Sequence, residues 1–444
     1  MRKGWPPYNW WVVPDVDVLV KMHVFNITNY DEIMSGTDTV FKVQEVGPII
    51  YREDLWHSNV TKNPNGTMAF VSNRVLEYLP EQNTINLNDT VYVPNLAYLG
   101  IASYLSDWHF ITRMGFNLLA RKYNISPIIK ITVYNLLWNY TDPLLETVSN
   151  VVPSLLPITN IGYLEMLYRN FSDENSVFIG IQHPRKYFTM DTYHRQNRFG
   201  FWPNKDCDSV QNATEGILYH QDITKDDVLY FFRKAMCRVA AIKFKEETER
   251  FGLKAYNFSL PLNTYHRPLN GSYDCYTLPG DTPLPDGLSD ISQCFFHFPI
   301  VSSFPHFLSV KPSDLRNLEG YTPDEKRHGC YSAVEPITGV PLESVARIQC
   351  NLRIKDVSSF PPAAPFKNMF LPLFWLELKQ DQIPQIMKIG LYLFVVITPK
   401  IQALISTALV ALGIALLYFR VIKVQKTTEY KGTYISLDPI PRTM

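Results

Sequence analysis

The stretch TVFKVQEVGPIIYRED, residues 39–54, decides the fold class of this 444-residue chain. In its first half, β-branched and aromatic residues alternate with polar ones, which is the pattern of a strand with one buried face. Gly47 and Pro48 then break the run, because neither residue continues a regular strand. Similar runs occupy residues 18–30, 67–79 and 90–96. The four runs predict half-buried antiparallel strands separated by polar turns.

A cluster of helices is predicted between the strands, over residues 95–150. Residues 96–123 have apolar side chains at helical spacing around most of the circumference, and residues 131–148 predict one or two further helices, broken at Pro143. The charge of this cluster is lopsided, since Asp107 is the only acid between residues 95 and 138. The bases there are Arg113, Arg121, Lys122 and Lys130. The whole chain has a formal net charge of zero, which argues against a general nucleic-acid binder.

A further helix is predicted over residues 224–252. Thr224 and Asp227 resemble a capping box, and apolar residues recur at steps of three and four between positions 228 and 242. Gly252 supplies a stop signal. This helix would contain Cys237. The rest of the second half alternates Pro- and Gly-rich strands with loops.

One segment near the carboxyl end is apolar enough for a membrane. Residues 403–419 carry no charge, and Ile401 and Gln402 extend them to about the ~20 residues that a bilayer requires. Basic residues follow at Arg420, Lys423, Lys426 and Lys431. Because cations gather on the cytoplasmic side, we expect an extracytoplasmic domain over 1–400, a transmembrane helix over 401–420 and a cytoplasmic tail over 421–444. In the tail, Tyr434 and Leu437 of YISL fit a tyrosine-based endocytic sorting signal.

Glycosylation signals agree with an exported chain. Asn-x-Ser/Thr occurs far more often than the roughly three copies that chance would supply. The acceptor positions are Asn26, Asn59, Asn65, Asn88, Asn124, Asn139, Asn170, Asn212, Asn257 and Asn270. N-glycans form on the lumenal side, so this surplus predicts a glycoprotein.

The six cysteines lie in the second half of the expected extracytoplasmic domain, and none forms a CxxC pair of zinc-site spacing. An even number in an exported chain predicts disulfides, although spacing alone leaves 15 pairings open.

Motifs of known enzymes are missing from the sequence. It contains no glycine-rich phosphate loop, GxSxG elbow, HExxH or GxGxxG. Asp206 and Asp208 could serve as the paired acids of a glycosidase, but solvated loop acids are the simpler interpretation. We therefore predict no enzyme, no metal site and no cofactor.

Several segments, taken in order, resemble the class B scavenger receptor family. They are HVFNITN, VQEVGPIIYRE, LLWNYTDPLL, CDSVQNATEG, MCRVAAIKF, DGLSDISQC, PIVSSFPHFL and VEPITGVPL followed by RIQCNL. The family includes the fatty-acid translocase, lysosomal integral membrane proteins and insect relatives such as Croquemort and the sensory neuron membrane proteins. The resemblance spans roughly residues 5–420. Family members have a transmembrane helix at each end, so the resemblance implies that this chain begins after the first one.

The resemblance implies an α+β fold: a large antiparallel β-barrel-like ectodomain, an apical helical bundle and an apolar tunnel toward the membrane. Lys122 matches the apical ligand-binding lysine of the family, with Arg121 beside it, and Arg113 and Lys130 extend the basic surface. The implied ligands are fatty acids, phospholipids, sterols, lipoprotein particles and apoptotic-cell surfaces. The implied location is the plasma membrane, with cycling through endosomes and lysosomes.

Two other functions are compatible with the same resemblance. One is a lysosomal membrane protein that exports lipid or docks a hydrolase, a protein ligand, on its apical helices. The other is a sensory membrane protein that delivers hydrophobic odorants.

The resemblance also implies two disulfides, which pair Cys207 with Cys275 and Cys237 with Cys294. The close-spaced third pair of the family is not matched, because Tyr276 and Thr277 follow Cys275. We expect Cys330 to pair with Cys350 instead, since the two flank the turn EPITGVP between what look like adjacent antiparallel strands.

Overall fold

The computed structural model describes residues 3–4, 6–151, 153, 157–169, 171–180, 184–268, 274–277 and 281–434. The chain divides into two compact units. Unit 1 comprises Met1–Arg250 and Lys254–Ile383, and unit 2 comprises Phe251–Leu253 and Pro384–Met444. The mixed helix and strand content agrees with the predicted α+β class.

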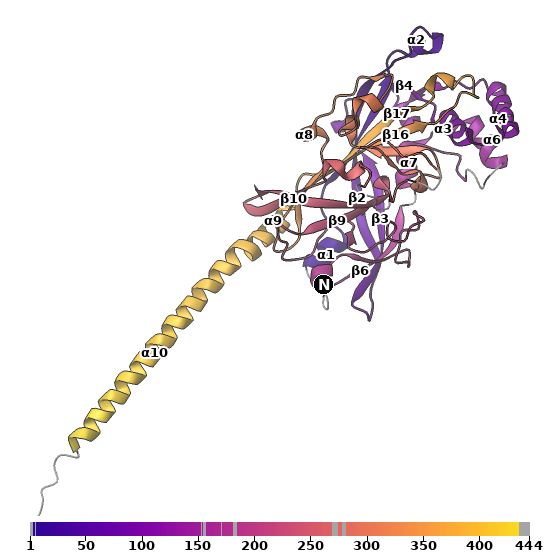
Figure 1. Ribbon diagram of the computed structural model, residues 1–444. Helices are drawn as coiled ribbons and strands as arrows, with labels where there is room; N and C mark the ends of the chain where they lie inside the picture. The colour runs from indigo at the N-terminus through magenta and orange to yellow at the C-terminus, as the bar shows by residue number, and fades with distance from the viewer. Residues whose placement is uncertain are drawn as a thin grey trace, which may run out of the picture. The chain divides into compact units, whose positions relative to one another are not determined.

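One large, nearly closed sheet organises unit 1 (Figure 1). Its main path runs β7-β6-β3-β2-β1-β17-β16-β15-β11-β10-β9-β8. The bounds are β1 Val18–Ile27, β2 Phe41–Lys62, β3 Thr67–Tyr78, β6 Ser172–Phe178, β7 Met190–Tyr193, β8 Ala213–Thr214, β9 Val228–Arg233, β10 Arg238–Arg250, β11 Leu253–Ser259, β15 Tyr331–Val334, β16 Pro341–Ile354 and β17 Met369–Gln380. Three short strands branch from this path: β12 (Ser289–Asp290), β13 (Ile300–Ser303) and β14 (Leu318–Glu319). The longest pairs are antiparallel, and β1 lies between β2 and β17.

The four predicted strands are confirmed as β1, β2, β3 and β4 (Thr90–Pro94). The predicted break at Gly47 and Pro48 is wrong, because β2 runs through both residues. The pairing of β1 with β2 instead shifts its register between Met22 and Val24. Gly47 has φ +149°, and a Cβ there would lie 2.7 Å from the carbonyl oxygen of Met22. Gly47 and Pro48 therefore produce a β-bulge within a continuous strand and do not end it.

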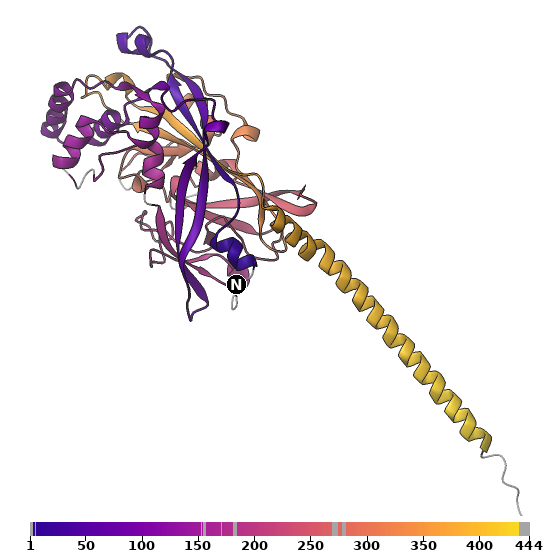
Figure 2. The ribbon, with the colours of Figure 1, turned by 180° about the vertical axis from the view of Figure 1, so that it is seen from behind.

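The helical cluster is confirmed. The predicted range 95–150 contains α3 (Leu96–Leu105), α4 (Phe110–Lys122), α5 (Val133–Trp138) and nearly all of α6 (Pro143–Val151), and α7 (Tyr163–Tyr168) follows beyond it. Between α4 and α5 lies β5 (Ile128–Thr132), which pairs antiparallel with β4 ahead of α3. Figures 1 and 2 both show α4 and α6 at the outer edge of unit 1, with α3 toward β16. Outside the cluster lie the short helices α1 (Pro6–Val12), α2 (Tyr30–Ser35) and α8 (Glu325–His328).

The helix predicted over residues 224–252 is wrong, because this segment forms the antiparallel pair β9 and β10. Asp227 does accept hydrogen bonds from the amide and hydroxyl of Thr224, at 2.7 and 2.9 Å, but these bonds close a turn before β9. Residues 234–237 form the connection, where Cys237 has φ +52°. Along β10, Arg238, Ala240 and Ile242 are buried in strict alternation, which is the period of a strand.

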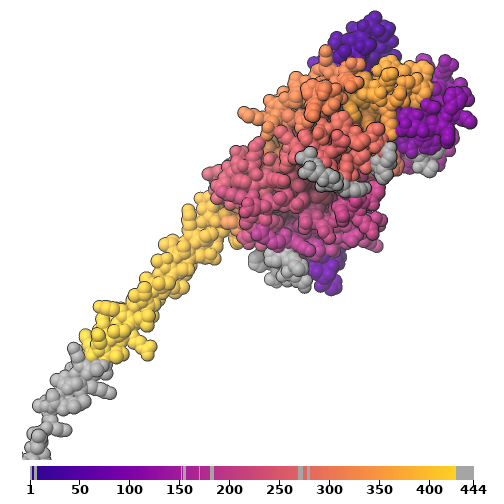
Figure 3. All heavy atoms as spheres, in the orientation of Figure 1, coloured from indigo at the N-terminus to yellow at the C-terminus, as the bar shows by residue number. Residues whose placement is uncertain are grey.

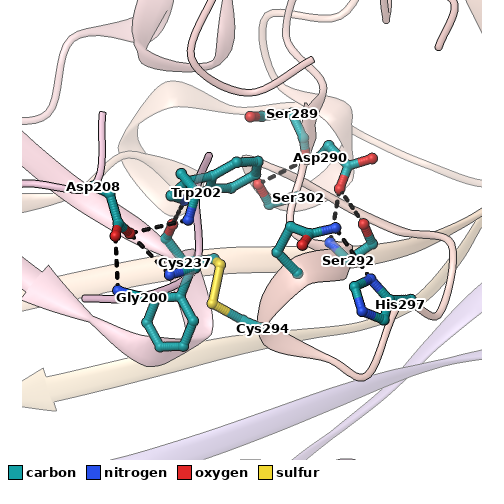
Figure 4. Close-up of a disulfide and its surroundings, with 12 residues drawn as sticks. Gly200, Trp202, Asp208, Cys237, Ser289, Asp290, Ser292, Cys294, His297 and Ser302 are labelled. Atoms are coloured by element: carbon teal, nitrogen blue, oxygen red, sulfur yellow. Dashed lines mark hydrogen bonds between the residues drawn. A yellow bond between two sulfur atoms is a disulfide. The ribbon is translucent and has the colours of Figure 1, made fainter. Parts of the chain in front are cut away.

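Two of the three expected disulfides are present, Cys207–Cys275 and Cys237–Cys294. The second lies beside the buried Asp208, whose carboxylate accepts from the amides of Gly200 and Trp202 at 2.8 and 3.0 Å (Figure 4). The interpretation of Asp208 as a solvated loop acid is therefore wrong. Its side chain instead holds the loop beside the disulfide through hydrogen bonds from the amides of Gly200, Phe201 and Trp202.

The expected Cys330–Cys350 disulfide is not formed, and both thiols are free and buried. The strands β15 and β16 are adjacent and antiparallel, as predicted, but Tyr331 pairs with Val345. This register places Cys330 nearer to Arg347 than to Cys350. The Cys330 Sγ accepts from the Arg347 amide at 3.1 Å and donates to its carbonyl at 3.2 Å.

Unit 2 is dominated by a long helical segment. α9 (Gln385–Tyr392) continues through a π-helical turn, Leu393–Ile397, into α10 (Thr398–Tyr434). The stretch Gln385–Lys426, 42 residues, is long and apolar enough to cross a membrane, and it contains the predicted span 401–420. Tyr434 of the sorting signal is the last residue of α10, and Leu437 lies outside the described residues.

Candidate ligand-binding surface

The helix α4 has two chemically distinct faces. Phe116 and Ala120 are buried toward the protein, as expected for one side of an amphipathic helix. The opposite side is also apolar but exposed, with Phe110 68% and Ile111 75% accessible. Met114 and Leu118 continue this stripe at helical spacing. A contiguous exposed apolar stripe of this kind marks an interaction surface.

The buried face of α4 is anchored to both the helical cluster and the sheet. Phe116 stacks on Tyr98 of α3, with ring centroids 5.7 Å apart, and meets Phe360 edge to face at 5.6 Å. Asn117 donates a hydrogen bond to the Ser359 carbonyl at 2.8 Å. In Figure 3 the purple surface of the helices accordingly lies beside the orange surface of the segment between β16 and β17. These contacts hold the exposed stripe facing outward.

The carboxyl end of α4 carries two exposed cations, Arg121 and Lys122. Asn124 ends the helix in the left-handed conformation, with φ +49°. Its amide donates to the carbonyl of Arg121 at 3.1 Å, and the amide of Ile125 donates to that of Ala120 at 3.0 Å, which together form a Schellman motif. The partial negative charge at a helix carboxyl end stabilises cations there. Lys122 also lies 5.2 Å from the centre of the Tyr123 ring.

The other two predicted cations do not join this pair. Arg113 is half-buried on α4, two turns earlier, and its Nε is buried without a hydrogen-bond partner in the described part of the chain. Lys130 belongs to β5, where it lies 5.6 Å from the Tyr92 ring of β4. The structure therefore groups Arg121 and Lys122 with the apolar stripe. We call Phe110, Ile111, Met114, Leu118, Arg121 and Lys122 the α4 surface.

Sequence reasoning identified the cations of this surface but missed its apolar half. The apolar half could have been found in the sequence, because the apolar residues of α4 fall on opposite sides of one helix. They therefore cannot all face the protein core. Asp107, the acid counted against the cations, lies 3.0 Å from Lys355 Nζ in an ion pair. It therefore does not neutralise the α4 surface.

Six of the sequon asparagines are exposed: Asn59, Asn65, Asn88, Asn124, Asn139 and Asn212. Asn26 and Asn257 are half-buried. The Asn26 side chain accepts from the Tyr92 amide at 2.8 Å, and Asn257 donates to Glu246 at 3.1 Å. Asn170 and Asn270 lie outside the described residues. Glycosylation at these ten positions stays a prediction.

Two cavities within unit 1 are both lined by β9 and β17, together with β2 and β3 in the first cavity and with β15 and β16 in the second. One has a volume of about 50 Å³ and the other of about 70 Å³. Arg233 and Leu378 line both. The walls of the first cavity also contain the charged residues Glu53, Arg74 and Glu215.

Comparison with known proteins places the whole described fold in one family. The CD36 family matches residues 1–424. Scavenger receptor class B member 1 of Bos taurus is 25% identical over 421 residues, which cover 94% of this chain and 80% of the relative. Lysosome membrane protein 2 of Homo sapiens is 27% identical over 383 residues, which cover 85% of this chain and 77% of the relative. The match spans the sheet, the helical cluster and most of the long carboxyl-terminal helix, and the chain therefore belongs to the CD36 family, that of the class B scavenger receptors.

Proposed function

We propose that this protein is a membrane receptor that captures anionic lipids or lipoprotein particles on the α4 surface. The observation that carries the proposal is the exposed apolar stripe of α4 ending in Arg121 and Lys122. A lipid particle presents the complementary chemistry, since its surface exposes carboxylate or phosphate groups next to acyl chains. The similarity to scavenger receptor class B member 1 supports the same role.

Both parts of the surface contribute to binding in this proposal. Each large apolar side chain that becomes fully buried contributes about 1.5–3 kcal/mol. Two exposed cations raise the local concentration of anions and orient their approach, an effect that salt weakens. The stripe therefore supplies affinity, and the cations select anionic over neutral particles.

The long helix of unit 2 anchors the receptor in the membrane under this proposal. Its 42-residue apolar stretch would be about 63 Å long, roughly twice the ~30 Å hydrocarbon core. Residues 401–420 then span the bilayer, with 1–400 outside the cytosol and 421–444 inside it. A 16-carbon chain in water would cost on the order of 10 kcal/mol, so the proposal requires an enclosed route by which captured lipid reaches the membrane.

A charge-reversal experiment tests capture. Cells that express the full chain are given fluorescent vesicles of phosphatidylcholine with or without phosphatidylserine. The double variant Arg121→Glu and Lys122→Glu should lose most uptake of the anionic vesicles, whereas Arg195→Glu, an exposed arginine of unit 1, should not. Equal uptake by the double variant and the unmodified chain, at equal surface amounts, would exclude the α4 surface as the collector.

A second function is favoured by the apolar stripe itself. Lysosome membrane protein 2 is among the relatives, and the stripe also suits an apolar patch on a protein such as a hydrolase. In that case Ile111→Asp with Leu118→Asp would abolish protein capture, while Arg121→Glu with Lys122→Glu would leave lipid release from lysosomes intact. The two double variants therefore separate the two functions.

Topology is tested separately. Surface labelling of the expressed chain, followed by glycosidase treatment, should remove a mass that corresponds to several N-glycans. A labelled chain without sugar would contradict the extracytoplasmic placement.

A further inference from the structure

The turn between β10 and β11 carries an aromatic side chain at a position where hairpins favour other residues. The two strands are neighbours in the sheet, and only Phe251 and Gly252 join them. Both turn residues have positive φ, +55° and +75°, as a type I′ turn requires. Asn, Asp and Gly favour these positions, because larger side chains are strained there. Phe251 is also 40% exposed, so neither the turn nor the protein core fully accounts for it.

The tip of this hairpin lies against α9, within unit 2. The Nζ of Lys388 lies 4.2 Å from the centre of the Phe251 ring. A Cβ added to Gly252 would lie 3.9 Å from the ring of Tyr392. Lys388 and Tyr392 are four residues apart, so they share one face of the helix. Two segments that are distant in sequence thus form one surface.

A neighbouring face of α9 is apolar and exposed. Ile386, Ile389 and Leu393 are each more than half accessible. They follow one another at steps of three and four, so they form a stripe along the helix, whereas the buried Met387 and Leu391 lie on another side. An exposed apolar stripe of this kind marks an interaction surface. We call Phe251, Ile386, Lys388, Ile389, Tyr392 and Leu393 the hairpin–α9 surface.

The position of this surface in the chain decides which partner fits. Under the proposed anchoring, on which this inference rests, residues 401–420 cross the bilayer. In a straight helix along the bilayer normal, Ile389 would lie about 18 Å beyond Ile401, whereas the headgroup region on each side is only about 5–8 Å deep. The stripe would then face water. Shifting the helix to bury the stripe in hydrocarbon would draw Lys400 in as well, which is costly.

The long helix is interrupted between the stripe and the span. A π-helical turn, Leu393–Ile397, follows α9, and Pro399 lies at the start of α10. The Thr398 hydroxyl donates to the Leu393 carbonyl at 2.8 Å. π-helical turns and prolines are the places where helices bend. With a bend here, α9 lies along the bilayer surface while α10 crosses the bilayer.

We propose that the hairpin–α9 surface binds the surface of the phospholipid bilayer, with Phe251 inserted among the headgroups. An interfacial helix buries its apolar face about 5–10 Å deep, which matches the stripe. Lys388 and Tyr392 suit the headgroup level, because lysine and tyrosine side chains anchor segments there. The hairpin tip thus gives the protein a second contact with the membrane besides the span. This contact is independent of the proposed lipid capture on the α4 surface.

Depth-dependent fluorescence quenching tests the contact in the full chain, reconstituted into nanodiscs of phosphatidylcholine and phosphatidylserine. The variants Phe251→Cys and Ile389→Cys each carry an NBD dye on the introduced thiol, since the native free thiols are buried. Phospholipid with a spin label on its headgroup should remove most of the emission of both dyes, and iodide in solution should remove little. Ile389→Cys leaves the turn unchanged, so it provides the test even if Phe251→Cys does not fold.

Two control positions calibrate the measurement. Arg195→Cys, at an exposed arginine of unit 1, should be quenched by iodide and not by labelled lipid. Leu409→Cys, at an exposed position of α10 within the span, should be quenched by lipid that carries its spin label deep on the acyl chain.

The Leu409 control separates this inference from the proposed anchoring. If Leu409 reports hydrocarbon while the dyes at 251 and 389 are quenched by iodide, the anchor is correct and the hairpin–α9 surface does not bind the bilayer. Dyes at 251 and 389 that are shielded from both quenchers would show that protein covers the surface, which also overturns the inference. If Leu409 itself is quenched by iodide and not by lipid, the anchoring fails and the contact fails with it.

Discussion

Asn117 of α4 donates a hydrogen bond to the Ser359 carbonyl at 2.8 Å, across 242 residues of sequence. The segment that contains Ser359 joins β16 to β17, two central strands of the sheet. The helix that carries the proposed ligand surface is thus attached to the most extensively paired part of unit 1. Its outward face is set by the sheet and not by the helical cluster alone.

The aromatic contact beside this hydrogen bond should be essential for stability. Phe116→Ala should lower the free energy of unfolding of unit 1 by about 3–5 kcal/mol, because it leaves a cavity between Tyr98 and Phe360. Phe110→Ala on the exposed side of the same helix should change it by less than about 0.5 kcal/mol. Urea unfolding measures both, and similar losses for the two variants would contradict the orientation of α4.

Two glycines should respond oppositely to a side chain. Gly339 has φ +75°, and a Cβ there would lie 2.3 Å from the His220 carbonyl oxygen. Gly339→Ala should therefore destabilise unit 1 by more than about 1 kcal/mol. Gly115 in α4 has open space around the added atom, so Gly115→Ala should stabilise it by about 0.5–1 kcal/mol. Thermal unfolding of the two variants provides the comparison.

Acidification should destabilise unit 1 through His328. Its pKa is lowered to about 4 by burial and by the charges of His306 and Arg327, against the opposing charges of Glu45 and Asp324. In the unfolded chain the pKa is about 6.5, so protonation favours unfolding between these two values. The contribution of His328 to the free energy of unfolding is fully present above about pH 6.5, and up to about 3 kcal/mol of it is lost as the pH falls toward 4.

His328→Gln should flatten this part of the stability profile, as measured by urea unfolding at a series of pH values. Glu45, which lies close to the same histidines, affects stability in a different pH range and can therefore be separated from His328. Burial would raise its pKa, but hydrogen bonds from His23 and His306 outweigh burial and lower it. Its contribution is present above the unfolded pKa near 4.5 and is lost only in more acidic solution. A slope between about pH 6.5 and 4.5 that survives in His328→Gln would assign the effect to other groups.

The two free thiols should be detected by alkylation. After denaturation without reductant, Cys330 and Cys350 should both be labelled, and the other four cysteines should not. In the folded protein neither should react, because burial raises the pKa of Cys330 to about 11 and that of Cys350 to about 12. Mass spectrometry of the peptides distinguishes these states, and an unlabelled pair after denaturation would restore the third disulfide.

The sequence was informative wherever one periodicity dominated. The alternation around Phe41 and Val43 predicted a strand, and the carboxyl-terminal apolar run predicted the long helix of unit 2. The segment 228–250 satisfied both periods, because its apolar residues recur at steps of three and four as well as two. The segment forms strands because β9 and β10 pair with each other within the large sheet. A helix at the same position would lack this packing.

The candidate sites were less predictable, because they combine residues that are distant in sequence. Arg121 and Lys122 are adjacent and could be identified, but Phe251 and Lys388 come from distant segments that only the fold brings together. Likewise, the turn EPITGVP correctly indicated that β15 and β16 are neighbours. It did not reveal the register, which sets the distance between Cys330 and Cys350.

The pairing of β1 with β17 has a consequence for biosynthesis. The innermost ladder joins Val18 to Gln380, so the centre of the sheet cannot close until nearly the entire polypeptide has left the ribosome. At about 5–20 residues per second, the nascent amino-terminal half waits for on the order of tens of seconds with an unpaired strand edge. During this time the edge of β1 that later pairs with β17 is open to association with other chains, so we expect the nascent chain to benefit from chaperone protection.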